Sequence, residues 1–194
     1  MISSNEGDAQ NRENNENGDT LIMKAFILDR DGVINVGGSI NKKEEFILIA
    51  GAAEAIKKLN QLGYEVFVAS NQGGVGLGYM SKSALAKLNE YMLELIRAEG
   101  GVIRDTRYCI HKPHARCRCR KPMPGMLNDL IEAYGIDRLC SFMVGDRDTD
   151  IQAGKSARLQ TIFIGQAAPR GANPDYQFES LAIAVTELHR AGII

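Results

Sequence analysis

Two aspartates, Asp29 and Asp31, are the residues of this chain that most directly suggest chemistry. They follow the apolar run Ala25–Leu28 and come just before Gly32, so an expected strand delivers two carboxylates to a tight turn. In open α/β sheets, ligands bind at the carboxyl ends of the strands. Two carboxylates this close together are unfavourable unless a cation or a shared proton offsets their charge. The pair therefore predicts a metal-assisted catalytic centre.

Three further groups of polar residues follow other expected strands. Residues 70–74 place a hydroxyl and two side-chain amides on a glycine-rich turn, which suits an anion. Arg120 and Lys121 place two cations before an expected helix, and residues 145–150 form an acidic loop that could complete a Mg²⁺ site. Taken singly, each group also fits an ordinary turn, loop or solvated charge pair. Their order along the chain, each after a strand, favours a catalytic site.

The cysteine loop, residues 109–119, contains a second group of residues that suggests chemistry, in this case metal binding. Its four candidate metal ligands are Cys109, His111, Cys117 and Cys119. Thiolates and an imidazole at these separations can supply a closed tetrahedral Zn²⁺ site. The alternatives are buried free thiols or a disulfide, but the loop is polar and disulfides are rare in a reducing cytoplasm. We expect a structural zinc, which leaves no ligand position for water and orients Arg120 and Lys121.

Strand and helix patterns alternate along the chain. Short apolar runs predict strands, and apolar residues at helical spacing predict helices. The expected strands are 25–28, 64–69, 106–110, 142–144 and 161–164, and the expected helices are 52–62, 82–99 and 124–134. This alternation predicts an α/β fold, a Rossmann-like three-layer α/β/α sandwich with a mainly parallel sheet. Cys140, beside the strand expected at 142–144, is expected to be a core residue.

The spacing of the motifs limits what can be inserted between them. The interval from Asp31 to Ser70 has room for one loop and one crossover helix. The interval from Ser70 to Lys121 is already filled by a helix, a strand and the cysteine loop. We therefore expect no cap domain, and an open site whose specificity comes from loops.

Composition describes an ordinary globular domain. The chain has 194 residues, of which 44% are hydrophobic and 24% charged, and a net charge of −1. This charge and the few aromatic residues do not favour nucleic acid or a membrane as partner. Residues 1–22 are polar and lack the apolar stretch of a secretory signal, so we expect a disordered extension before one domain at 23–194. The expected protein is a cytoplasmic monomer.

The motifs resemble those of the haloacid dehalogenase (HAD) superfamily of phosphatases, over nearly everything from residue 24 to about residue 164. The resemblance rests, in chain order, on Asp29-x-Asp31, Ser70, Lys121 and Gly145-Asp146-x-x-x-Asp150. It implies a HAD-like fold and a Mg²⁺-dependent phosphomonoesterase that acts on a small phosphorylated metabolite.

The same resemblance implies a role for each motif residue. Asp29 would be the nucleophile and form an aspartyl-phosphate, while Asp31 would protonate the leaving oxygen and afterwards activate water. Ser70 and Lys121 would hold the phosphoryl oxygens. Mg²⁺ would be bound by Asp29, the backbone carbonyl of Asp31 and Asp146.

The cysteine loop beside residues 120–122 narrows the resemblance to one subgroup. This subgroup contains D-glycero-D-manno-heptose 1,7-bisphosphate 7-phosphatases and histidinol-phosphate phosphatases. Residues 29–35, 70–74 and 119–127 are more similar to the heptose enzymes. The subgroup implies that the substrate-binding residues are Asn71, Gln72, Gly73, Arg120 and Arg147.

The chain also departs from the heptose enzymes. Residues 36–40 lack the tyrosine common there, Leu77 stands where many have arginine, and the gap between His111 and Cys117 resembles the histidinol-phosphate type. We rank a heptose bisphosphate first as substrate, histidinol phosphate second and another small sugar phosphate third. A different class, an inactive zinc-stabilised binding protein on a HAD scaffold, stays open because a fold does not guarantee activity.

Overall fold

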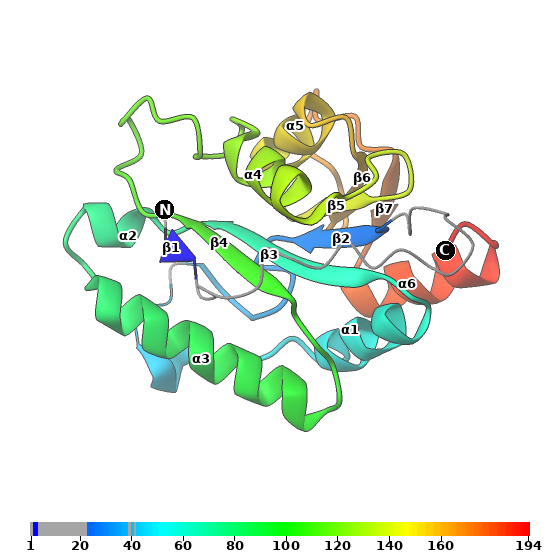
Figure 1. Cartoon of the computed structure of the whole chain (residues 1–194), viewed down its shortest axis with the longest axis horizontal. Helices are drawn as coiled ribbons and strands as arrows, with labels where there is room; N and C mark the ends of the chain where they lie inside the picture. The colour runs from blue at the N-terminus through cyan, green and yellow to red at the C-terminus, as the bar shows by residue number, and fades with distance from the viewer. Residues whose placement is uncertain (1, 4–22, 39, 41) are drawn as a thin grey trace.

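A seven-stranded sheet between two layers of helices forms the body of the protein, as the computed structural model shows (Figure 1). The structure describes residues 2–3, 23–38, 40 and 42–194. The strands, in spatial order, are β1 (Ile2–Ser3), β4 (Asp105–Cys109), β3 (Glu65–Asn71), β2 (Ala25–Leu28), β5 (Phe142–Gly145), β6 (Gln160–Ile164) and β7 (Tyr176–Phe178). Strand β1 pairs antiparallel with β4, and the other six strands run parallel.

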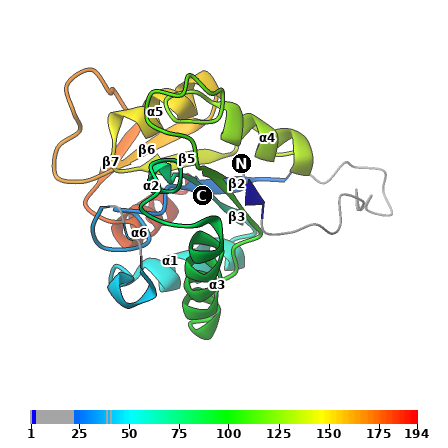
Figure 2. The ribbon, with the colours of Figure 1, turned by 90° about the vertical axis from the view of Figure 1, so that its left-hand side faces the viewer.

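Helices cover both faces of the sheet, as a buried parallel sheet requires. Five longer helices build the two layers: α1 (Ala52–Gln61), α3 (Lys82–Ala98), α4 (Gly125–Tyr134), α5 (Asp148–Ser156) and α6 (Leu181–Arg190). Helices α1, α3 and α6 lie on one face, and α4 and α5 on the other (Figure 2). Two short helices, η1 (Lys43–Glu45) and α2 (Gly73–Gly76), lie in connections.

The central strands are apolar on both faces. In β2, Phe26 and Leu28 belong to one hydrophobic core, whereas Ala25 and Ile27 belong to the core on the opposite face. Successive side chains of a strand point to opposite faces, so a strand covered on both sides must be apolar throughout. This explains why all four residues of Ala25–Leu28 are apolar.

The strand order reverses direction at β2. The chain passes from β2 to β3 and β4 on one side and then returns to β5 on the other side of β2. The crevice at such a switch point, beyond the carboxyl ends of the strands, is where open α/β sheets bind ligands. Asp29 follows β2 and Asp146 follows β5, so both carboxylates flank this crevice.

The expected elements are present, with ends that differ by one to two residues. Helix α4 starts at Gly125 with Pro124 at its N-cap, and β3 continues through Asn71. The acidic stretch at 145–150 is not all loop, because helix α5 already begins at Asp148. Strands β1 and β7 and helices η1, α2 and α5 were not predicted.

The expected disorder of residues 1–22 falls outside the described residues, except for Ile2–Ser3, which form β1. Cys140 is exposed, so its expected place in the core was wrong. The chain turns at Leu139 and Cys140 before β5 begins, and both side chains remain outside the apolar layer. Among the described residues, no helix is both long and apolar enough to cross a membrane.

Candidate active site

The end of β2 holds Asp29 against β5. The backbone N–H of Asp29 donates to the carbonyl of Val144 at 2.8 Å, which extends the pairing of the two strands by one residue. Gly32 then turns the chain with a positive φ of 87°. A Cβ atom at this position would lie 2.2 Å from Oδ2 of Asp146, so only glycine allows the two loops to approach this closely.

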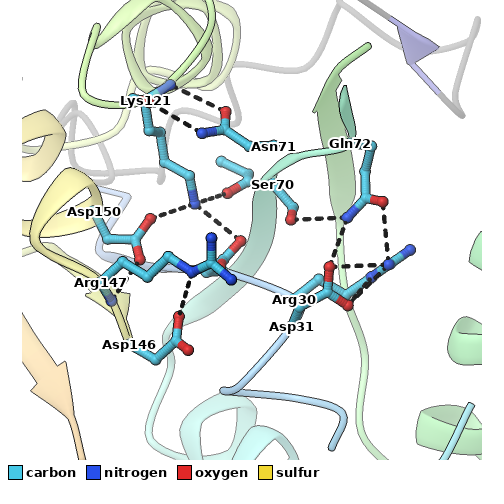
Figure 3. A network of polar contacts seen from close by, with 11 residues as sticks. Arg30, Asp31, Ser70, Asn71, Gln72, Lys121, Asp146, Arg147 and Asp150 are labelled. Carbon is cyan, nitrogen blue, oxygen red and sulfur yellow. Dashed lines mark hydrogen bonds and ion pairs between the residues drawn. The ribbon is translucent and has the colours of Figure 1, made fainter. Parts of the chain in front are cut away.

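Lys121 lies at the centre of the site and is only 2% exposed. Its Nζ is 2.9 Å from Oδ1 of Asp29 and 2.6 Å from Oδ1 of Asp150, and it donates to the carbonyl of Ala69 at 2.6 Å (Figure 3). Burial alone would lower the pKa of Lys121, but the carboxylates of Asp150 and Asp29 raise it above its ordinary value. The ammonium group is therefore charged and tied to the ends of β2, β3 and α5.

Two further carboxylates, Asp146 and Asp150, lie beside Asp29. Burial raises the pKa of Asp150 to about 6, although the Lys121 ammonium opposes this shift. Burial and the neighbouring Asp29 charge raise the pKa of Asp146. Carboxylate oxygens of the three residues lie within 4.8 Å of one another. The cluster thus carries more negative charge than Lys121 offsets.

Oδ1 of Asp146 is buried and accepts no hydrogen bond from the described residues. Its nearest cation, the guanidinium of Arg147, is 4.0 Å away. A buried carboxylate oxygen needs a hydrogen-bond donor or a cation. Oxygen ligands at this separation suit a hard divalent cation such as Mg²⁺.

Asp31 faces a different set of partners from Asp29. Its carboxylate accepts hydrogen bonds from Arg30, Asn35 and Gln72, over distances of 2.8–3.1 Å. Arg30 is fully buried and approaches Asp31 with two of its nitrogens. These partners hold the Asp31 carboxylate in one orientation at the edge of the cavity.

Gln72 connects Asp31 to the end of β3. Its amide nitrogen donates to Asp31 at 2.9 Å and to Oγ of Ser70 at 3.2 Å, while its amide oxygen accepts from Arg30 at 3.2 Å. Gln72 is 4% exposed and all its amide groups are engaged within the protein. In this structure its side chain orients Asp31 and Ser70, so its predicted contact with substrate stays a prediction.

Asn71 binds the backbone of Lys121 on both sides. Its Nδ2 donates to the carbonyl of Lys121, and its Oδ1 accepts from the Lys121 N–H, both at 3.0 Å (Figure 3). This paired contact attaches the segment after the cysteine loop to the end of β3. The side chain predicted to bind substrate thus serves here to position Lys121.

The four predicted zinc ligands come together at the end of β4. Sγ of Cys109 is 3.6 Å from Sγ of Cys117 and 3.3 Å from Sγ of Cys119. Nδ1 of His111 is 3.2 Å from Sγ of Cys119. A tetrahedral zinc, with bonds of about 2.0–2.3 Å, needs ligand atoms a little under 4 Å apart. The cluster therefore fits a tetrahedral metal.

The electrostatics of the cluster also fit a metal. Burial raises the pKa of the Cys119 thiol to about 12 and raises that of Cys109. Thiolates at these two positions need a cation beside them, and a coordinating zinc deprotonates its thiol ligands.

A cavity of about 620 Å³ opens over these groups. Eight of the nine residues predicted for catalysis or substrate binding line it: Asp29, Asp31, Ser70, Asn71, Gly73, Arg120, Lys121 and Arg147. Gln72 lies behind Ser70 and does not line it. Five further lining residues come from the cysteine loop and from the segment after Lys121: Pro113, Arg116, Cys117, Pro122 and Met123.

Two residues of the site were not selected from the sequence. Asp150 belongs to the quoted motif, but its role as the second partner of Lys121 depends on the first turn of α5. Arg30 lies between the two aspartates, where strand alternation would point it away from both. The turn at residues 30–35 instead brings its guanidinium onto Asp31. No signal in the sequence predicted this contact.

Comparisons with known proteins agree on one family. The HAD-hydrolase-like family model matches residues 118–184. The D-glycero-β-D-manno-heptose-1,7-bisphosphate 7-phosphatase of Pseudomonas aeruginosa is 39% identical over 141 residues, which cover 72% of this chain and 79% of that protein. The protein of the same name from Neisseria meningitidis serogroup A is 39% identical over 146 residues, covering 72% and 78%.

A solved structure is similar over most of the chain. The crystal structure of D,D-heptose 1,7-bisphosphate phosphatase from B. bronchiseptica, complexed with magnesium and phosphate, has a TM-score of 0.79 and 30% sequence identity. The match covers 87% of this chain and 99% of that one.

Replacing Asn71 tests the attachment of Lys121 to β3. The variant Asn71→Ala leaves a backbone N–H and a carbonyl without partners, which we expect to cost about 1–2 kcal/mol of unfolding free energy. Gln152→Ala, which removes an exposed amide from α5, serves as control and should change stability by less than about 0.5 kcal/mol. Urea unfolding of both variants measures the difference, and equal stabilities would contradict the structural role of Asn71.

Proposed function

The chain belongs to the D-glycero-D-manno-heptose 1,7-bisphosphate 7-phosphatase family of HAD-like hydrolases, and from this premise we propose that it removes the C7 phosphate of a heptose 1,7-bisphosphate. It is a phosphoric monoester hydrolase by its family. The observation that carries the proposal is the juxtaposition of Asp29, Lys121 and Asp146 under one cavity at the switch point of the sheet.

A carboxylate nucleophile divides the hydrolysis into two displacements. In the first, an oxygen of Asp29 attacks phosphorus and the bond from phosphorus to the C7 oxygen breaks, while Asp31 gives a proton to the departing oxygen. In the second, water attacks the phosphorus of the aspartyl-phosphate, Asp31 takes a proton from that water, and Asp29 is released with inorganic phosphate. Both residues line the cavity.

The remaining groups bind and orient the phosphoryl oxygens. Lys121 and Ser70 line the cavity beside Asp29 and would hold these oxygens against the nucleophile. A positive group at this point reduces the repulsion between the phosphate and the Asp29 carboxylate. Asp150 keeps the Lys121 ammonium in place by its contact of 2.6 Å.

One Mg²⁺ ion fits the acidic cluster. The carboxylates of Asp29 and Asp146 and the backbone carbonyl of Asp31 would hold it, and the free buried oxygen of Asp146 supports this assignment. When bound, the ion supplies positive charge to the phosphoryl group during transfer.

The zinc site, in this proposal, is structural. All four ligand positions are filled by protein atoms, and Arg120 and Lys121 follow Cys119 directly. A metal that holds Cys117 and Cys119 against Cys109 thereby fixes the backbone that carries both cations. Monomeric state and cytoplasmic location stay predictions.

A comparison of substrates tests the proposed function. We expect kcat/KM for heptose 1,7-bisphosphate, assayed as both anomers, to exceed that for histidinol phosphate by at least about tenfold, with turnover that depends on Mg²⁺. A higher kcat/KM for histidinol phosphate would contradict the heptose assignment and make histidinol phosphate the proposed substrate. An absence of Mg²⁺-dependent turnover on any phosphomonoester, including an aryl phosphate, would favour the binding-protein alternative.

Replacing Asp31 tests its role in proton transfer. In Asp31→Asn, kcat should fall about 10²–10⁴-fold because the leaving oxygen lacks a proton donor, while KM changes little. Asp137→Asn, which removes a carboxylate outside the cavity, is the matched control and should keep wild-type kcat. An unchanged kcat in Asp31→Asn would contradict the assignment of Asp31 as the general acid and base.

Removing zinc tests the role of the cysteine loop. We expect about one zinc per chain in protein prepared without chelators, and its removal should lower kcat/KM while Mg²⁺ activation persists. Cys117→Ser should lower zinc content, whereas Cys140→Ser should not, because Cys140 is exposed and outside the cluster. Metal analysis and Mg²⁺ titration give the readout, and zinc-free wild-type protein would refute the site.

A further inference from the structure

Arg30 is a charged residue in the interior of the protein, between the two aspartates of the site. Its exposed fraction is 0%, and it is one of the largest fully buried side chains. Its guanidinium pairs with Asp31 at 2.8 Å, and its Nη1 atom is buried without a hydrogen-bond acceptor among the described residues. A buried ion pair adds little to stability, because the loss of hydration offsets the attraction between the charges. Stability of the fold therefore does not explain why an arginine occupies this position.

Three side chains surround the Asp31 carboxylate, and we call Arg30, Asn35 and Gln72 the Asp31 clamp. Oδ1 of Asp31 accepts from Nε and Nη2 of Arg30 at 3.0 and 2.8 Å and from Nδ2 of Asn35 at 3.1 Å. Oδ2 accepts from Nε2 of Gln72 at 2.9 Å and from Nη2 of Arg30 at 3.1 Å (Figure 3). Both oxygens are held, and Arg30 alone contacts both of them through one planar group.

The backbone between β2 and α1 builds most of this clamp. The carbonyl of Arg30 accepts from the N–H groups of Ile34 and Asn35, at 2.9 and 3.2 Å, and the N–H of Gly32 donates to the carbonyl of Asn35 at 2.9 Å. This tight turn brings Arg30 and Asn35 to the same carboxylate. Gln72 reaches it from the end of β3. The clamp is thus fixed by the turn and by the sheet.

The clamp gives the two aspartates different surroundings. Carboxylate oxygens of Asp29, Asp146 and Asp150 lie within 4.8 Å of one another, and Asp31 is not a member of this group. A carboxylate one residue from Asp29 would otherwise be attracted to Lys121 or to a divalent cation in the acidic cluster. In either place it would be turned away from the leaving oxygen of a substrate.

We propose that Arg30 is a positioning residue for proton transfer, which holds the Asp31 carboxylate apart from the acidic cluster and directed into the cavity. The inference rests on the proposed function, because it takes Asp31 to exchange protons with the leaving oxygen and with water. Arg30 is not among the residues that line the cavity, so it acts through Asp31 and not on the substrate. Misplacing a reacting group by about 1 Å can cost about 10²-fold in rate.

A comparison of leaving groups tests this role. A sugar alcohol needs a proton as it departs, whereas p-nitrophenolate departs readily without one. In Arg30→Met we expect kcat/KM to fall about 10- to 100-fold for heptose 1,7-bisphosphate but less than about threefold for p-nitrophenyl phosphate. Equal losses on the two substrates would contradict the proposal, because a general disturbance of the site lowers both values.

The second displacement supplies an independent signature. There Asp31 takes a proton from water, and the leaving group has already departed. With p-nitrophenyl phosphate, Arg30→Met should therefore lower kcat and KM together and show a rapid burst of about one p-nitrophenol per active site before the steady state. A burst no larger than that of wild type would overturn the role of Arg30 in this transfer.

A residue that acts through Asp31 should have no further effect once Asp31 is replaced. The double variant Arg30→Met/Asp31→Asn should keep the kcat/KM of Asp31→Asn on heptose 1,7-bisphosphate to within about threefold. If the two losses multiply instead, Arg30 acts independently of Asp31 and the proposal is wrong. Arg30→Lys should recover part of the loss of Arg30→Met, because the charge remains but the paired donors do not.

Arg107 provides the matched control for the removal of a largely buried guanidinium. It pairs with Asp105 within β4, and neither residue lines the cavity. Arg107→Met should keep the wild-type ratio of the two kcat/KM values, even if it lowers stability. A changed ratio in this variant would contradict the assignment to Arg30.

Metal binding and unfolding show whether the rest of the site is intact. By calorimetry, Arg30→Met should bind Mg²⁺ at least as tightly as wild type, because a released Asp31 carboxylate can join the acidic cluster. Weaker Mg²⁺ binding would indicate a damaged metal site and would overturn the proposal. If urea unfolding shows that Arg30→Met does not fold, Arg30→Lys decides the leaving-group comparison, with the same preferential loss expected on the sugar substrate.

The failure of this inference and the failure of the proposed function give different results. If wild type hydrolyses p-nitrophenyl phosphate but not heptose 1,7-bisphosphate, the proposed substrate is wrong. Phenyl phosphate, whose leaving group is poorer than p-nitrophenolate, then replaces the sugar in the comparison. A greater loss on phenyl phosphate in Arg30→Met supports the positioning role, and an equal loss overturns it.

Discussion

The buried ammonium of Lys121 is the interaction on which the rest of the site depends. It binds carboxylates that follow β2 and begin α5, and a carbonyl at the end of β3. A buried charge is unfavourable unless it is paired and hydrogen-bonded, and three partners meet this need. The same contacts place Lys121 beside Asp29, where the phosphate binds in the proposed function. Structural stability and phosphate binding therefore place the same requirement on this one side chain.

The backbone around Lys121 is held from two sides. Asn71 bonds to both backbone groups of Lys121, and the metal-ligand cluster ends at Cys119, two residues earlier. The segment between β4 and α4 has no regular secondary structure, so ordering it carries an entropic cost. The Asn71 contacts offset part of that cost, and the zinc of the proposed function would offset more of it. This arrangement explains how a long loop can hold Lys121 in a fixed position beside Asp29.

Charges around the cavity divide into two groups. The carboxylates of Asp29 and Asp146 face the crevice between β2 and β5, where a divalent cation fits. The guanidinium group of Arg116 belongs to the cysteine loop, and that of Arg120 follows the loop directly. The described residues contain no cap domain, so in the proposed function the loops around the cavity distinguish substrates.

The sequence by itself determined the order of the five central strands and of three of the helices, and it singled out the candidate catalytic motifs and the cysteine ligand set, because strand alternation and short-range spacing are local properties. It also predicted that Asp29 and Ser70 would lie close together, since the carboxyl ends of parallel strands share one edge. The position of Lys121 beside them was implied by the family resemblance. Only the tertiary structure decided what each side chain contacts. Arg30 turns onto Asp31, Asn71 binds the backbone of Lys121, and Asp150 pairs with Lys121. These partners lie on different elements or depend on a tight turn, so no local pattern encodes them.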